Sequence, residues 1–131
     1  MDLTGSPLVV DYAPQLDLIR RAALVITHAG MNTAMETLSQ GVPLVAIPVT
    51  NDQPGVAARV KWTGTGEMVP LSKLDTARLT AATVRVFGDE SYRNAAERIQ
   101  RAIHAAGGPT RAAEICEQAI ATREPVTAEI R

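Results

Sequence analysis

The sequence is poor in aromatic residues and has a single cysteine. Its only aromatic residues are Tyr12, Trp62, Phe87 and Tyr92, so we expect a core of aliphatic side chains and alanine. Cys116 has no second cysteine with which to form an internal disulfide. It falls in an apparent helix with nothing nearby in the sequence to activate its thiol, and we interpret it as buried and inert.

The charges are balanced, and no long apolar run is present. The chain has 13 Lys and Arg residues against 14 Asp and Glu residues, a formal net charge of −1, and no basic patch. We therefore expect no binding to nucleic acid and no polybasic membrane anchor. No apolar run approaches the ~20 residues that span a bilayer, and the first residues lack a signal-peptide profile. These absences favour a cytoplasmic protein without a transmembrane segment.

Several catalytic patterns are missing as well. The two histidines, His28 and His104, form no cluster of metal ligands with the single cysteine, which is remote in sequence from His28. The chain contains neither a GxSxG nucleophile motif nor a Walker loop. The sequence therefore predicts no metal site and no bound cofactor.

Apolar runs alternate with helical patterns along the chain. Its 131 residues suffice for one domain, 1–131, and are too few for two comfortable ones. Strands are predicted at 8–10, 24–27, 44–47 and 67–69, and helices at 15–21, 32–40, 56–62, 76–87, 90–106 and 110–122. This order indicates an α/β domain with a Rossmann-like parallel sheet of about four strands, flanking helices and a helical C-terminus. A tail at 123–131 is expected to be frayed.

Polar residues follow the predicted strand at 24–27. His28 comes directly after it, and Gly30 permits a tight turn into the next helix. In an open α/β sheet, ligands bind beyond the carboxyl ends of parallel strands, where a helix N-terminus presents unpaired N–H groups to an anion. His28 can face a phosphate there, or it can simply cap the strand end. Asn32 and Thr33 suit a helix N-cap, which is compatible with phosphate binding.

An acid and an acid–amide pair come next along the chain. Glu36 lies one turn into the helix, where the helix dipole favours an acid, and it could also accept hydrogen bonds from a ribose diol. Asp52 and Gln53 follow the strand at 44–47 and precede a proline, as in a turn. A neighbouring acid and amide also offer the acceptors and donors that a sugar with several hydroxyls requires.

These residues belong to a longer spaced pattern that covers residues 12–53. Its positions are Tyr12-Ala13-Pro14-Gln15, His28, Gly30, Asn32, Thr33, Glu36, Gly41-Val42-Pro43, Pro48 and Asp52-Gln53. The pattern closely resembles the donor-binding signature of nucleotide-sugar-dependent glycosyltransferases of family 1, which have the two-domain GT-B fold. The segment 51–55 looks especially like bacterial members that glycosylate hydrophobic aglycones such as carotenoids or macrolides.

The resemblance implies that the first part of the pattern holds a nucleoside. Tyr12 would stack on uracil, in the place where plant members have tryptophan, and Ala13 would pair with the base through its backbone. Gln15 and Glu36 would hold the ribose.

The resemblance implies roles for the two loops as well. The diphosphate would be held by four residues at the helix start: His28, Gly30, Asn32 and Thr33. Asp52 and Gln53 would contact the donor sugar. No metal is implied, because the helix N-terminus and His28 would stabilise the departing diphosphate.

The family has parts for which this chain has no counterpart. Its general-base histidine and carboxylate partner lie in an N-terminal domain that accepts the aglycone, so we expect no catalytic residue in this chain. The first two strands of the C-terminal domain are also missing, and in the order 3-2-1-4-5-6 they would lie between the strands at 8–10 and 24–27. We expect the first strand to move beside the second, or the gap to be filled by a homodimer or a partner chain.

The leading hypothesis is the UDP-sugar-binding part of an inverting glycosyltransferase. The parent enzyme would transfer a sugar, with glucose the first candidate, to a hydroxyl of a small lipophilic acceptor, and the chain alone would be inactive. One alternative is a non-catalytic nucleotide-binding subunit of a split transferase. Others are a fragment of a GT-B N-acetylglucosaminyltransferase or epimerase, and an α/β domain whose polar residues are only caps and turns.

Overall fold

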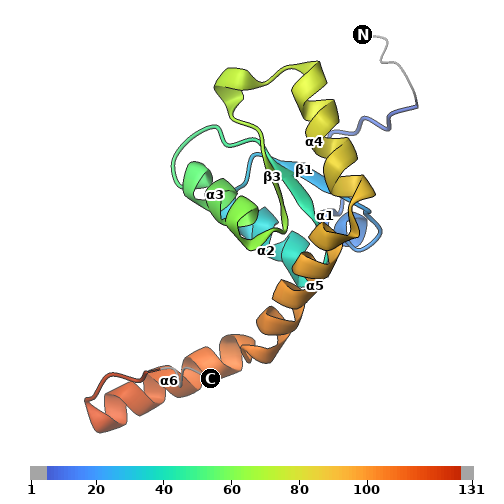
Figure 1. The fold of residues 1–131 in the computed structure, drawn as a ribbon. Coiled ribbons are helices and arrows are strands. Elements are labelled where there is room, and N and C mark those ends of the chain that lie inside the picture. Colours follow the sequence, from blue (N-terminus) through green and yellow to red (C-terminus); the bar gives the residue numbers. More distant parts are fainter. Residues whose placement is uncertain (1–5, 128–131) are drawn as a thin grey trace.

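The computed structural model describes residues 6–127 and contains a three-stranded parallel sheet (Figure 1). Its strands, in the order β1-β2-β3, are β1 (Val25–Thr27), β2 (Leu44–Ala46) and β3 (Gly66–Met68). The helices are α1 (Gln15–Ile19), α2 (Met31–Ser39), α3 (Gln53–Thr63), α4 (Thr76–Gly88), α5 (Glu90–Ala105) and α6 (Gly108–Thr122), with a 3-10 turn η1 (Leu71–Lys73). The predicted α/β class with a small parallel sheet is confirmed, and each predicted helix is present with its ends at most three residues from those predicted.

The predicted strand at 8–10 is wrong. Leu8, Val9 and Val10 form no strand, and they are 89%, 75% and 52% exposed. A strand is held by hydrogen bonds to a neighbouring strand, and within residues 6–127 this segment pairs with none. The sheet therefore has three strands in place of about four, and the segment did not move beside β1. On the side away from β2, β1 has no partner among the described residues.

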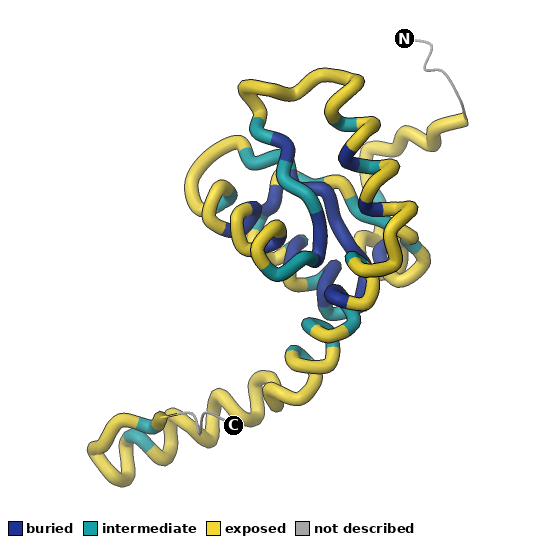
Figure 2. Tube along the Cα trace, in the orientation of Figure 1, coloured by how far each residue is buried: buried dark blue, intermediate teal, exposed yellow. Residues whose placement is uncertain are grey.

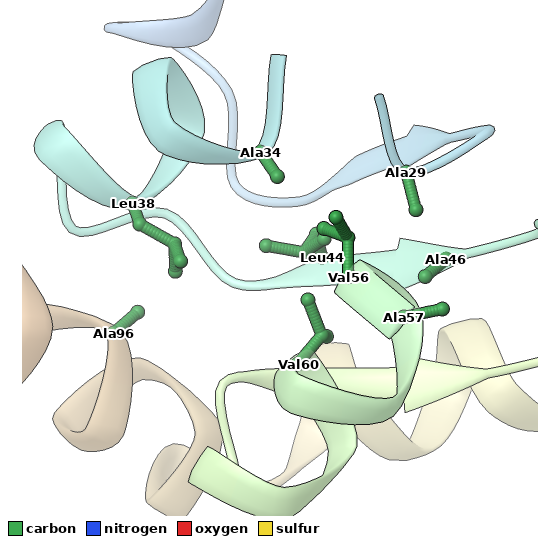
Figure 3. Packing of buried hydrophobic residues seen from close by; sticks show 9 residues of the cluster. All are labelled: Ala29, Ala34, Leu38, Leu44, Ala46, Val56, Ala57, Val60 and Ala96. Carbon is green, nitrogen blue, oxygen red and sulfur yellow. The ribbon is translucent and has the colours of Figure 1, made fainter. Parts of the chain in front are cut away.

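The core is aliphatic and rich in alanine, as predicted. All of β2 is buried because it lies between the other two strands and is covered on both faces. Side chains alternate across a strand, so Leu44 and Ala46 face one side and Val45 faces the other. The first side packs against α2, α3 and α5, and Figure 3 shows its buried residues: Ala29, Ala34, Leu38, Leu44, Ala46, Val56, Ala57, Val60 and Ala96.

The other face of the sheet is covered by α4 (Figure 1). Val45 packs there with Val69, Ala82 and Val86, and Tyr92 from α5 closes one side of this smaller cluster. Helices on both faces explain why the predicted strands read as continuous apolar runs.

The last helix, α6, projects away from the sheet (Figure 1). Figure 2 shows nearly all of it exposed, and none of its residues is buried. Cys116 on this helix is exposed too, so the prediction of a buried thiol is wrong. Apolar spacing along a helix predicts an apolar face but not whether another element covers it. The helix ends at Thr122, and of the predicted tail, residues 128–131 lie outside the described part.

No helix within residues 6–127 is long and apolar enough to cross a membrane.

Candidate functional site

The turn from β1 into α2 leaves a helix N-terminus without a side-chain cap. The N-cap residue is Gly30, which has no side chain to accept from the first turn. In the described part of the chain, the backbone N–H groups of Met31, Asn32 and Thr33 have no acceptor, whereas the amide of Ala34 reaches the Gly30 carbonyl at 3.0 Å. Three free amides at the positive end of the helix dipole can bind an anion.

Asn32 and Thr33 do not cap this helix. They occupy its second and third positions, inside the helix, and neither side chain bonds to a first-turn amide. The interpretation of these residues as N-caps is therefore wrong. Their side chains lie in the first turn, beside the free amides.

The same turn places the His28 ring against the backbone of Gly30. A Cβ atom at residue 30 would lie 2.6 Å from His28 Nε2, so only glycine leaves room for the ring in this position. Between the two, Ala29 is fully buried and has φ of 65°, a conformation that residues with a Cβ rarely adopt. His28, Gly30, Met31, Asn32 and Thr33 line a shallow depression of about 370 Å³ over this helix end.

A second polar cluster joins α1 to α2. The side-chain amide of Gln15 donates to Glu36 Oε2 at 2.5 Å, and its nitrogen lies 3.5 Å from Thr33 Oγ1. Gln15 and Glu36 are 21 positions apart in the sequence, so only the fold brings them together. Thr33 also lines the depression over the helix end, which makes the two clusters neighbours.

The Gln15–Glu36 cluster opens onto its own depression of about 360 Å³. Tyr12 lines it together with both residues, and the Tyr12 residue is 86% exposed. Ala13 is half-buried and does not line the depression. Arg20 also lines it, paired with Asp17 at 3.2 Å. Arg20 could not be identified from the sequence as a lining residue, since spacing alone indicates the ion pair but not the surface that it faces.

Asp52 and Gln53 belong to the neighbouring loop, between β2 and α3. Because β1 and β2 are parallel, with Thr27 beside Ala46, this loop and the His28 turn leave the sheet at the same edge. No hydrogen bond within residues 6–127 joins the side chain of Asp52 or Gln53 to the other two clusters, and neither residue lines their depressions. The helix α3 begins at Gln53, three residues earlier than the predicted start at 56, so Gln53 is helical and not part of a turn.

Asp52 and Gln53 differ in what their side chains do. Asp52 is the N-cap residue of α3, yet its exposed carboxylate bonds to no amide of that helix. The Gln53 side-chain oxygen accepts from the backbone N–H groups of Val49 at 2.9 Å and Thr50 at 3.0 Å. Across the described residues, no three His, Cys, Asp or Glu side chains lie close enough to share a metal ion.

The domain has a parallel α/β fold, with an uncapped helix N-terminus and polar clusters at the carboxyl edge of its sheet. Parallel α/β folds bind nucleotides at this edge, so these features define a class of nucleotide-binding domains. Residues 3–119 match the family described as "Erythromycin biosynthesis protein CIII-like, C-terminal domain". The chain belongs to this family, and the resemblance to the C-terminal domain of GT-B glycosyltransferases is confirmed.

Named relatives agree with this assignment. The chain is 38% identical over 119 residues to a zeaxanthin glucosyltransferase of Pantoea ananas, covering 90% of this chain and 27% of that protein. A crystal structure of the glycosyltransferase of kitacinnamycin superposes with a TM-score of 0.77 at 33% identity, over 82% of this chain and 28% of the other. A protein from O. sativa, crystallised with UDP and deoxynivalenol-3-glucoside, superposes with a TM-score of 0.64 at 30% identity, over 72% and 24%. The chain thus spans about a quarter of the length of these relatives.

Proposed function

We propose that this domain binds the UDP-sugar donor of an inverting glycosyltransferase, with UDP-glucose as the donor. The observation that carries the proposal is the contact of Gln15 with Glu36 and Thr33, directly beside the free amides of α2. Acceptors for a diol thereby lie next to donors for a diphosphate. A ribose and its diphosphate are joined in this order in a nucleotide sugar.

The diphosphate would bind at the start of α2. The free amides of Met31, Asn32 and Thr33 donate to its oxygens, and the helix dipole adds about 0.3–1 kcal/mol for a negative charge at this end. His28 lies over the same depression and would donate to a phosphate oxygen, with the Asn32 and Thr33 side chains beside it. These groups would also stabilise the diphosphate as it leaves, without a metal ion.

The nucleoside would lie in the depression of Tyr12, Gln15 and Glu36. Gln15 occupies Oε2 of Glu36, which leaves Oε1 to accept from the ribose diol. The exposed Tyr12 ring offers a face on which uracil can stack, and the backbone of Ala13 would pair with the base edge. The relative from O. sativa that was crystallised with UDP supports this choice of nucleotide.

The donor sugar would be held at the Asp52–Gln53 pair, with the Asp52 carboxylate in contact with its hydroxyls. Transfer with inversion is a displacement in which an acceptor hydroxyl attacks the anomeric carbon while the diphosphate leaves from the opposite face. The hydroxyl must lose its proton to a base, and we assign that base and the binding of a small lipophilic acceptor to a further domain or a partner chain. By itself this chain is then a donor-binding part without transferase activity.

Titration calorimetry with UDP and 2′-deoxy-UDP tests the proposal. We expect UDP to bind at least about tenfold more tightly than 2′-deoxy-UDP, because a hydrogen bond to a charged carboxylate contributes about 1.5–3 kcal/mol. Glu36→Ala should weaken UDP binding and abolish this preference, and His28→Ala should weaken binding of both nucleotides. Glu117→Ala on the exposed α6 is the matched control and should change neither affinity. Absence of UDP binding at millimolar concentration, or full affinity in Glu36→Ala, would refute the proposal.

A second candidate is a non-catalytic nucleotide-binding subunit that completes its sheet with another chain. The outer edge of β1 favours it, because no described residue pairs with it and an unpaired strand edge is a template for a further strand; Ile26 at its centre is 48% exposed. Sedimentation velocity over a range of concentrations tests it. Self-association that Ile26→Lys abolishes would support pairing with a second copy, and a monomer at all concentrations would exclude the homodimer.

A further inference from the structure

The loop that carries Asp52 has a backbone turn bond from Gln53 N–H to the Thr50 carbonyl at 3.2 Å, and one side chain bonds back onto it as well. Gln53, the first residue of α3, turns its amide back onto the loop and accepts from two consecutive backbone N–H groups, those of Val49 and Thr50. The distances are 2.9 and 3.0 Å, which are good hydrogen-bond lengths. An amide oxygen has two lone pairs, so both are used within the loop.

The backbone next to the bonded amides takes a left-handed turn just before Asp52. Asn51, between the bonded amides and Asp52, has φ of 55°, in the left-handed region that asparagine adopts more readily than most residues with a Cβ atom. Asp52 has no side-chain cap bond of its own to fix its carboxylate. The position of Asp52 is therefore set by the backbone of the loop, and the Gln53 side chain bonds to this backbone.

We propose that Gln53 is a positioning residue: its amide oxygen fixes the loop so that the Asp52 carboxylate meets the donor sugar. This inference rests on the proposed function, because it needs a bound UDP-sugar. It differs from a direct sugar contact by Gln53, which would depend on the amide nitrogen. The two roles belong to different atoms of one side chain, so substitution can separate them.

The substitutions Gln53→Glu and Gln53→Met separate the role of the amide oxygen from that of the amide nitrogen. Glutamate keeps an oxygen at the same place and loses the N–H donors, whereas methionine keeps the length of the side chain and loses both. Hydrogen exchange followed by NMR should show the Val49 and Thr50 amides exchanging at least about tenfold faster in Gln53→Met, and at the wild-type rate or slower in Gln53→Glu. This measurement needs no ligand.

Calorimetry with UDP and UDP-glucose gives the functional result. The ratio of the two affinities isolates the sugar, because the added charge of glutamate acts on both nucleotides through the same diphosphate. We expect the preference for UDP-glucose over UDP to fall at least about fivefold in Gln53→Met, and to stay within about twofold of wild type in Gln53→Glu.

The outcomes separate the inference from the proposed function. Wild-type protein that does not bind UDP refutes the proposed function and this inference together. If UDP binds normally, the positioning role alone is overturned by an unchanged ratio in Gln53→Met, or by an equal loss in both variants, which would show direct contact through the amide nitrogen. Equal wild-type affinity for UDP and UDP-glucose also overturns it, because no sugar contact would remain to be positioned.

Discussion

Replacing Tyr92 by phenylalanine should loosen the attachment of α5 to the sheet. The Tyr92 hydroxyl donates to Glu67 Oε1 on β3 at 2.7 Å, and Arg85 Nε on α4 lies 3.4 Å from the same oxygen. One carboxylate thus joins three elements. Phenylalanine keeps the ring in its place against the cluster that contains Val45 and removes only the hydroxyl, so the substitution isolates the hydrogen bond.

The expected loss follows from the exposure of the partners. A hydrogen bond to a charged group contributes about 1.5–3 kcal/mol, but the Glu67 side chain is 21% exposed and Tyr92 is only half-buried, so solvent screening reduces this figure. We expect Tyr92→Phe to lower the free energy of unfolding by about 1 kcal/mol, a fall in Tm of roughly 3–5 °C for a domain of this size. Arg85 is 57% exposed, and its ion pair should add little.

The same bond should make this difference depend on pH. The hydrogen bond to Glu67, with burial and the nearby negative charge, raises the pKa of Tyr92 to about 12. An unfolded tyrosine has a pKa of about 10, so the folded-state pKa is the higher one. The contribution of the hydroxyl is then complete below pH ~10 and is lost as the pH rises through the folded-state value. The gap in stability between wild type and Tyr92→Phe should therefore close between pH ~10 and 12.

Urea denaturation followed by circular dichroism measures these quantities. Tyr12→Phe is the matched control, because Tyr12 is 86% exposed and its hydroxyl makes no hydrogen bond within residues 6–127. It should leave stability unchanged. If Tyr92→Phe is as stable as wild type at pH 7, or if the gap persists undiminished above pH ~12, the hydrogen bond to Glu67 does not stabilise the fold.

Three further predictions concern packing and exposure. Gly66→Ala would place a Cβ atom 1.8 Å from a backbone oxygen of β2 and should cost at least about 2 kcal/mol in urea denaturation, whereas Gly55→Ala, with open space around it, should be neutral or stabilising. Leu44→Ala, at a fully buried position, should lower the free energy of unfolding by about 2–5 kcal/mol. Leu8→Ala, at an exposed position, should lower it by less than about 0.5 kcal/mol, and similar losses in the two variants would contradict the assigned core. Cys116 should react completely with a disulfide reagent such as DTNB in the native protein, and protection until unfolding would show that α6 is covered.

The alternation of elements could be predicted because each signal is local. The apolar runs at 24–27, 44–47 and 67–69 all became strands of one parallel sheet, and glycine and proline marked most of the helix ends. The run at 8–10 has the same local character, yet it forms no strand, because strand formation depends on a neighbour that local sequence cannot supply. The prediction that Cys116 is buried failed for a similar reason, because its exposure depends on the direction in which α6 leaves the domain.

The sequence predicted which residues belong to the candidate site, but not the contacts that they make. The spacing from Tyr12 to Gln53 resembled a family signature, and the family itself is confirmed, so the residues could be named before the fold was known. The contacts that these residues make could not be predicted from the sequence. Spacing gave no sign that Gly30 is the N-cap of α2, or that Gln53 uses its amide oxygen within its own loop. The ligand roles of these residues stay predictions that the titrations described above can test.

The sequence by itself determined which segments become helices and central strands, and which family the chain belongs to, because both depend on residue types at fixed spacing. Only the tertiary structure decided which polar groups are free. Gln15 meets Glu36 across 21 positions because α1 packs on α2, and within residues 6–127 the amides at the start of α2 are unpaired because Gly30 offers them no side chain. A free donor or acceptor is defined by what surrounds it in space, and the surroundings come from residues distant in the chain.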